Sequence, residues 1–230
     1  MADKTLSTAE KFLMIAHHPE RGRFMVSGMF IQYGVTGAIL LDMTLDGSLE
    51  MKDRKLLLWP GRVDDKSVRD DVAALMSASE KPMKTGFWVR KLARRYNRYL
   101  VRVLNEMEKK RLVRTEKRKF LGLIPYRKSF LVESYTRSNL IRQLKSDILS
   151  YTSESSPSGV AIACLIEACR MQRIMSSDRD ELKTIRTQLK KIVKESPVSE
   201  AVGQTIREVQ AAIMASVTAA VIAATAGGHH

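Results

Sequence analysis

Cysteine and aromatic residues are scarce in this 230-residue sequence, and their scarcity narrows the fold classes that it can adopt. The two cysteines, Cys164 and Cys169, form neither a disulfide framework nor a zinc-binding spacing. Because their neighbours are apolar, we predict two buried thiols in a reducing compartment. Few aromatics (6%), twelve methionines and glycine-poor blocks with helical periodicity favour a mainly α protein.

Long apolar segments are also rare. The N-terminal stretch MADKTLSTAEKF has no apolar core of the kind that directs export, so we expect a cytoplasmic protein. The uncharged run AAIMASVTAAVIAATA, from Ala211 to Ala226, is shorter than the roughly 20 residues that span a bilayer. It is also rich in alanine and contains serine and threonine. We predict a buried core helix here, with a membrane anchor as the alternative.

Acidic residues almost disappear between Lys84 and Lys128, where sixteen residues are basic and three are acidic. The whole chain carries a formal charge of +14, so most of its net charge lies in this segment. Such a concentration of positive charge attracts anionic partners. Nucleic acid and an anionic membrane surface are the two candidates.

The pattern of periodicity and turn residues predicts helices joined by short β segments. Ser7-Thr8-Ala9-Glu10 has the form of a capping box that opens the first helix. SLEMKDRKLLLW (48–59) contains two short β-like runs, and residues 112–133 alternate as a β-hairpin. We predict one mainly α domain over residues 5–225. The expected helices cover about 10–18, 25–45, 66–79, 87–110, 138–149, 159–175, 178–194 and 199–224.

The helix expected at 87–110 is the leading candidate for a binding site. Its arginines recur every four residues on one side, and an apolar stripe on another side should face the core. Carboxylates elsewhere in the fold could neutralise these arginines, which is the alternative interpretation. The candidate phosphate-binding residues are Arg90, Arg94, Arg95, Arg98 and Arg102, with Trp88 as a candidate interfacial anchor.

The expected hairpin is basic as well, and its middle is apolar. Interleaved basic and apolar residues suit a membrane interface. The same apolar side chains could instead contact another subunit or the chain's own core. The candidate residues for self-association or membrane contact are Phe120, Leu121, Leu123 and Ile124.

Residues with catalytic or metal-binding patterns are not found. His17 and His18 are adjacent at a helix end, where bonding to terminal carbonyls is expected. Gly34 and Gly37 fall inside a helix and indicate close packing rather than a phosphate loop. We therefore predict no catalytic residue, no metal ligand and no cofactor.

Two segments resemble the Golgi phosphoprotein family. GVTGAILLDMTLDGSLEMKDRKLLL (Gly34 to Leu58) is similar to the family's helix, its glycine stop and the strand that follows. RTEKRKF (Arg114 to Phe120) is similar to the start of the family's β-hairpin. The order of elements agrees from about Leu6 to Ala224. The resemblance implies a mostly helical single domain with a protruding hairpin.

The resemblance also implies a peripheral membrane protein that binds phosphatidylinositol 4-phosphate on a basic face. In the family the hairpin supports self-association, and eukaryotic members hold protein clients. The family's headgroup pocket uses a tryptophan and three arginines. The matching positions here are Ser27, Thr36, Asn97 and Leu100, so the resemblance transfers the region rather than the pocket.

Three functional hypotheses follow. The first is a cytoplasmic, peripherally membrane-associated protein that binds anionic lipid through its basic face. The second is a nucleic-acid-binding protein that uses the basic helix and the hairpin, although no helix rich in base-reading residues accompanies them. The third is an adaptor for protein partners, which is compatible with the first.

Overall fold

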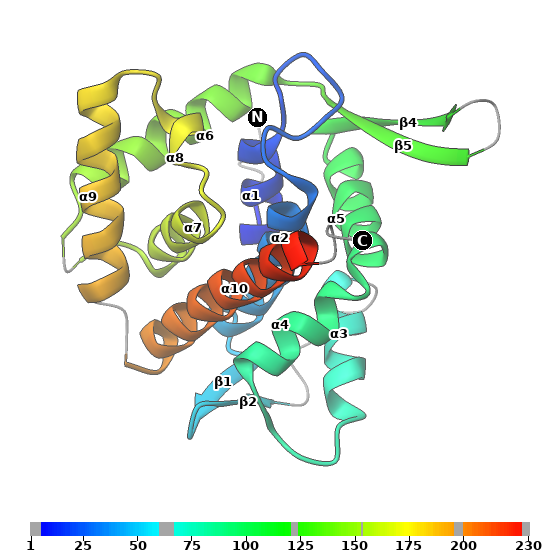
Figure 1. Ribbon diagram of the computed structural model, residues 1–230, viewed down its shortest axis with the longest axis vertical. Helices are drawn as coiled ribbons and strands as arrows, with labels where there is room; N and C mark the ends of the chain where they lie inside the picture. Colours follow the sequence, from blue (N-terminus) through cyan, green and yellow to red (C-terminus); the bar gives the residue numbers. More distant parts are fainter. Residues whose placement is uncertain (1–5, 60–66, 121–123, 153, 196–199, 227–230) are drawn as a thin grey trace.

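A computed structural model describes residues 6–59, 67–120, 124–152, 154–195 and 200–226 (Figure 1). Of the described residues, 66% are helical, which confirms the mainly α class. The helices are α1 (Thr8–Ala16), α2 (Gly28–Leu45), α3 (Val68–Ser77), α4 (Thr85–Ala93), α5 (Tyr96–Lys109), α6 (Ser134–Leu149), α7 (Pro157–Ala168), α8 (Gln172–Met175), α9 (Arg179–Glu195) and α10 (Glu200–Ala226). The strands are β1 (Leu49–Lys52), β2 (Lys55–Leu58), β3 (Met83–Lys84), β4 (Val113–Phe120) and β5 (Ile124–Leu131).

Helix α2 lies at the centre of the molecule and packs against α1, α4, α7 and α10. Two of its glycines allow neighbouring helices to approach closely. A Cβ atom at Gly34 would overlap the Phe12 ring of α1, and one at Gly37 would lie 2.5 Å from Ile213 Cδ1 of α10. Both glycines therefore serve packing, as their position inside a helix predicted.

The first helix begins at the predicted capping box. Ser7 Oγ accepts from the backbone amide of Glu10, and the Glu10 carboxylate accepts from the amide of Ser7. Asp42 of α2 accepts from the amides of Thr8 and Ala9, which ties α1 to the central helix. Burial raises the pKa of this Asp42 carboxyl.

The β segments form two small antiparallel sheets in the described residues. Strands β1, β2 and β3 pair in that order, and the β1–β2 turn has positive φ at both Asp53 and Arg54. The sequence predicted the first two strands but only a break at β3. Strands β4 and β5 form the predicted hairpin, with Val113 opposite Leu131 at its base and Phe120 opposite Ile124. Figure 1 shows this hairpin projecting from the helical body.

Two long predicted helices are each divided. The expected helix at 159–175 ends as α7, passes through Arg170 with a φ of 53°, and resumes as α8. The expected helix at 87–110 is broken between α4 and α5. At that break Gln32 Nε2 of α2 donates to the carbonyl of Ala93 at 2.8 Å. Ala93 is the last residue of α4, so this oxygen has a partner on α2 where the helix stops.

The two cysteines are buried, as predicted, on α7 and at its end. Burial raises the pKa of the Cys164 thiol to about 12 and raises that of Cys169 as well. Both thiols are therefore unreactive packing groups in the folded chain.

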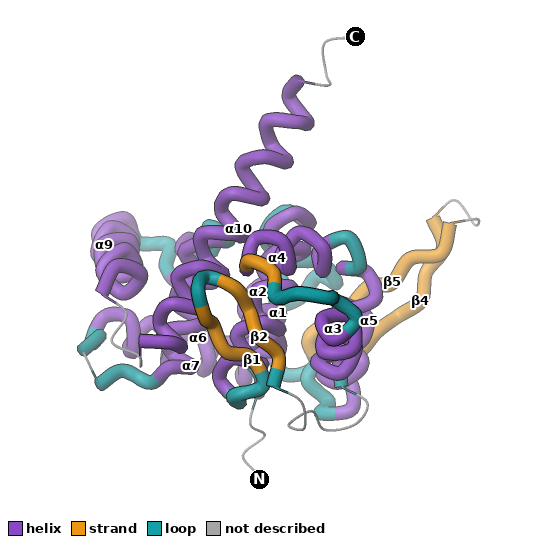
Figure 2. The backbone as a smooth tube through the Cα atoms, turned by 90° about the horizontal axis from the view of Figure 1, so that it is seen from below, coloured by secondary structure: helices purple, strands orange, loops and turns teal. Residues whose placement is uncertain are grey.

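Helix α10 differs from its prediction as a buried core helix. Its first half packs through Ile206, Val209 and Ile213, which are fully buried. Figure 2 shows its C-terminal part projecting well beyond the body of the molecule. Val221 and Ile222 in that part are 48% and 61% exposed. The prediction is therefore wrong for this end, because no other element of the described chain reaches far enough to cover it.

Among the described residues, two helices are long and apolar enough to cross a membrane, by length and composition alone. One is α2, whose residues are mostly buried at the centre of the fold. The other is the part of α10 from Val202 to Ala223, of which 39% is buried. Core packing explains the apolar character of α2. It explains that of α10 only in part, because much of the segment from Val202 to Ala223 is not buried.

Candidate functional site

The candidate site is the joint between α4 and α5, where the basic helix is divided. Arg94 and Arg95 occupy the joint itself and are exposed. Arg98 and Arg102 follow on the first turns of α5. The hydrogen bond from Gln32 to Ala93 fixes the joint against α2. We call Arg94, Arg95, Arg98 and Arg102 the arginine cluster.

One carboxylate serves two members of this cluster. Asp71 of α3 forms ion pairs with Arg98 Nη2 at 2.7 Å and with Arg102 Nε at 2.9 Å. Arg102 Nη1 also donates to the backbone carbonyl of Ser67. No ion pair joins Arg94 or Arg95 to a carboxylate in the described part of the chain. The alternative of internal neutralisation therefore holds for two arginines only, and even these share one negative charge.

Three of the four arginines of the cluster act electrostatically on one side chain, Tyr99. Burial raises the pKa of its phenol, and the charges of Arg95, Asp71, Arg98 and Arg102 also act on it. These four groups therefore lie around one side chain. Three positive charges beside a single carboxylate leave a positive surface that suits phosphate groups.

Arg90, the remaining candidate arginine, lies apart from the cluster. It is exposed on α4, and its Nη1 would be 3.4 Å from a Cβ atom placed at Gly86. The same Cβ position is 4.0 Å from Ala212 Cβ of α10. Arg90 is therefore next to α10, whereas the cluster lies toward α3.

The interpretation of Trp88 as an interfacial anchor is wrong. Its side chain is 1% exposed and belongs to the hydrophobic core. Phe87 packs edge-on against its ring, and Lys91 Nζ lies 5.0 Å from the ring centroid. At this position the apolar side of α4 faces the interior, so the indole cannot reach a membrane.

The hairpin carries more positive charge than its carboxylate, Glu116, neutralises. Arg114 and Arg118 both bind Glu116 at 2.8 and 2.7 Å, while Lys117, Lys119 and Arg127 are exposed. Leu121 and Leu123, two of the residues predicted to make contact at its tip, lie outside the described residues. Phe120 and Ile124 pair through their backbones, and their side chains are not described.

The base of the hairpin is attached to the body through α1. His17 Nε2 bonds Ser129 Oγ at 2.7 Å, and His17 Nδ1 bonds the carbonyl of Leu13 at 2.8 Å. The bond to a helix-terminal carbonyl was predicted for this residue. Lys110 Nζ also bonds the buried Glu10 carboxylate at 2.6 Å, which joins the end of α5 to α1.

The four positions that match the family's headgroup pocket carry no cation. Thr36 is 1% exposed and donates its hydroxyl to the carbonyl of Gln32. Ser27 and Asn97 are exposed, and Leu100 is half-buried against the core. The positive charge of this region therefore comes from the arginine cluster and not from those positions.

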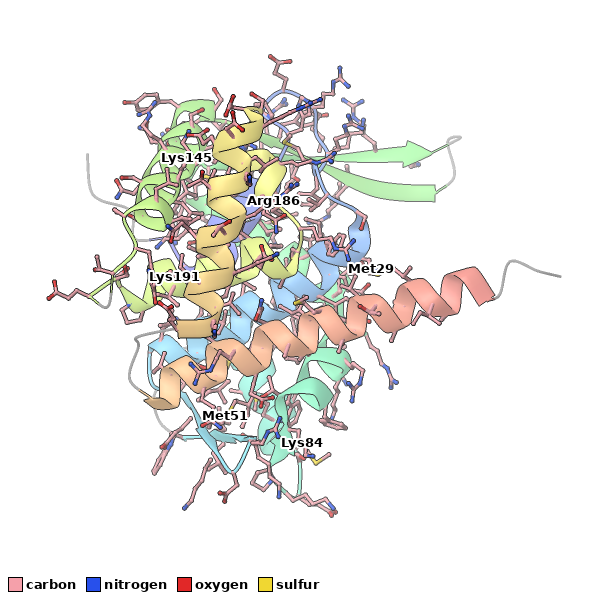
Figure 3. All side chains as sticks on the ribbon, turned by 60° about the vertical axis from the view of Figure 1, so that its left-hand side comes forward. Met29, Met51, Lys84, Lys145, Arg186 and Lys191 are labelled. Carbon is pink, nitrogen blue, oxygen red and sulfur yellow. The ribbon has the colours of Figure 1, made fainter. Side chains whose placement is uncertain are left out.

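Sequence reasoning missed a second basic region on the other side of α10. A cavity of about 560 Å³ lies between the α7–α8 turn, α9 and α10. We call it the basic groove, because it is lined by Arg170, Arg173, Arg186 and Lys190. Figure 3 labels Arg186 on α9, and the cavity is lined by this residue together with Met214, Val217 and Thr218 of α10. Only the four-residue spacing of Arg186 and Lys190 hinted at it in the sequence.

Comparison with known proteins matches most of the chain to one family. A family model described as Golgi phosphoprotein 3 (GPP34) matches residues 8–209. No curated protein matches the chain. The matched span contains the arginine cluster, the hairpin and all four cations of the basic groove. It stops at Val209, before the projecting part of α10.

Proposed function

Because this chain belongs to the Golgi phosphoprotein 3 (GPP34) family, we propose that it is a peripheral membrane protein that binds anionic phospholipid headgroups through the arginine cluster. The family is a lipid-binding and adaptor family, associated peripherally with the Golgi membrane and known for binding phosphoinositide. The observation that carries the proposal is the charge balance of the cluster. Arg94 and Arg95 are exposed, and the single negative charge of Asp71 offsets only part of the positive charge of Arg98 and Arg102.

The proposed interaction is with phosphate charge rather than with one headgroup. The cluster lies at the joint between α4 and α5, and the pocket-matching positions supply no cation. We therefore expect binding to follow surface charge density, since each arginine near an anionic leaflet contributes about 1 kcal/mol. Self-association through the hairpin and adaptor contacts with protein clients remain predictions.

The first test is vesicle co-sedimentation of the full chain. Arg94→Glu/Arg95→Glu should lower the affinity for phosphatidylcholine vesicles containing phosphatidylserine by at least about tenfold, because two attractions of about 1 kcal/mol become repulsions. Lys52→Glu/Lys55→Glu makes the same charge change at exposed positions of β1 and β2 and should have a much smaller effect.

Three outcomes would contradict the proposal. One is wild-type binding that ignores lipid charge or is unchanged by high salt. Another is an equal loss in both double variants. The third is tight binding to duplex DNA or RNA with a steep salt dependence while anionic vesicles are not bound, which would favour the nucleic-acid hypothesis. Vesicles matched in charge but containing phosphatidylinositol 4-phosphate should bind about as well as those with phosphatidylserine.

A further inference from the structure

The projecting end of α10 exposes aliphatic side chains in a segment without charge. No charged residue occurs from Ala211 to Ala226. Beyond Val217, which is still buried, Ala219, Val221, Ile222 and Ala223 are all exposed. Aliphatic surface kept in water is unfavourable, and a group of such residues marks an interaction site.

The basic groove lies directly beside the place where α10 leaves the body. Its wall includes Met214, Val217 and Thr218 of α10, so the cations and the projecting helix share one surface. Glu167 is the one carboxylate among the described lining residues, and it accepts from Gln172 Nε2. No ion pair joins any of the four cations of the groove to a carboxylate of the described chain.

Positive charge also lies on the opposite side of α10. Arg90 lies near Ala212 of α10, because a Cβ atom at Gly86 would be 3.4 Å from Arg90 Nη1 and 4.0 Å from Ala212 Cβ. Figure 2 places α4 on the side of the molecule from which α10 projects. The apolar end therefore leaves the body between cations from α4 on one side and from α7–α9 on the other.

The backbone at Arg170 singles out one cation of the groove. Its φ of 53° is in the left-handed region, at a helix end where glycine is the favoured residue. The amide of Met171 bonds the carbonyl of Ile166, which closes this end of α7. Arg170 therefore places a guanidinium on the groove at a turn that glycine would form with less backbone strain.

We propose that the projecting end of α10 inserts into the boundary between headgroups and acyl chains of an anionic bilayer, while Arg170, Arg173, Arg186 and Lys190 meet lipid phosphates beside it. The inference rests on the proposed function and adds a second contact surface to it. Apolar residues flanked by basic ones are the chemistry of interfacial helices.

Charge complementarity distinguishes the bilayer from a second copy of the chain. Two copies that paired through their projecting helices in a two-fold contact would bring both sets of groove cations toward each other. Like charges at such a contact oppose it. An anionic leaflet satisfies the aliphatic side chains and the cations together.

An environment-sensitive label tests insertion directly. Ile222→Cys, labelled with nitrobenzoxadiazole, should show a blue shift and brighter emission with vesicles of phosphatidylcholine and phosphatidylserine, and little change with phosphatidylcholine alone. Cys164 and Cys169 are buried thiols with raised pKa, so the introduced thiol is the reactive one. Leu149→Cys, at the exposed end of α6, is the matched control and should show no shift.

Substitutions test the energetic contribution of the same surface. Val221→Glu/Ile222→Glu and Arg186→Glu/Lys190→Glu should each reduce vesicle affinity by at least about tenfold. Leu149→Glu should leave it unchanged. Arg170→Gly should weaken binding by a few-fold without lowering the thermal midpoint, because glycine suits the left-handed backbone. That variant separates loss of binding from loss of fold.

The outcomes also separate this inference from the proposed function. If vesicles bind the wild type and Arg94→Glu/Arg95→Glu weakens that binding, an unshifted label at position 222 overturns insertion while the proposed function stands. If the wild type does not bind anionic vesicles, both fail. If Val221→Glu/Ile222→Glu dissociates an oligomer in sedimentation without changing vesicle binding, the surface is a self-association site and the inference is wrong.

Discussion

At the scale of single residues, His17 joins two elements in its neutral form. A carbonyl only accepts, so His17 Nδ1 donates to Leu13, and Nε2 is left to accept from the Ser129 hydroxyl. Burial, together with the nearby charge of Arg137, lowers the pKa of His17 from 6.5 to about 4. The base of the hairpin therefore depends on an imidazole that stays uncharged.

The stability of the chain should consequently fall in mild acid. The unfolded chain takes up a proton near pH 6.5, whereas folded His17 does so only near pH 4. The stabilisation that neutral His17 contributes to the folded state is complete above pH 6.5, and it is lost as the pH falls toward 4. Between pH 7 and 5 we expect a loss of about 2 kcal/mol from this group, measured by urea unfolding. His17→Gln should be less stable at pH 7 and should vary less with pH; an unchanged pH dependence would rule out His17 as the cause.

Close packing at Gly34 leads to a second prediction. Alanine there gains about 1 kcal/mol of helix propensity, but its Cβ atom would overlap the ring of Phe12, which is completely buried. Overpacking of this kind costs about 1–3 kcal/mol, so Gly34→Ala should be destabilising overall. Gly28 is the first residue of the same helix and has no atom within 4 Å of a Cβ position, so Gly28→Ala should be neutral to slightly stabilising. Thermal unfolding of both variants checks the contrast.

At the scale of elements, the features encoded in consecutive residues were predicted correctly. The helix break that lies against a residue distant in the sequence was not predicted. The capping box at Ser7 and the hairpin over 112–133 are each specified by consecutive residues, and both are confirmed. The division of the basic helix falls where Gln32, which lies far from Ala93 in the sequence, donates to the carbonyl of Ala93. Trp88 likewise falls on a helix whose buried side is set by α4 packing against α10 and α2.

Asp71 on α3 controls how much of the charge on α5 is available. Asp71→Asn removes the carboxylate that Arg98 and Arg102 share, so affinity for anionic vesicles should rise about three- to tenfold. Stability should fall by no more than about 1 kcal/mol, because these pairs are near the surface. Asp147→Asn on α6 makes the same charge change at an exposed site. Equal effects of the two variants in co-sedimentation would show that only net charge matters.

At the scale of the whole molecule, family and fold class could be predicted from the sequence, and the arrangement of charge could not. One buried cluster includes residues from α1 to α10, which supports the proposal of a single domain. The basic groove combines Arg170, Arg173, Arg186 and Lys190 with α10 through tertiary packing alone. The exposed end of α10 was missed for a similar reason: an alanine-rich run without charge looks the same whether or not another element covers it.

The projection of α10 also determines where order in the molecule is weakest. From Thr218 to Ala223 most side chains touch no neighbour closely enough to be buried, so the helix there is maintained mainly by its own backbone hydrogen bonds. A helical segment this short is marginal in water when nothing packs against it. Amide protons should therefore exchange progressively faster along α10 toward its C-terminus, and whatever surface receives this end would slow that exchange.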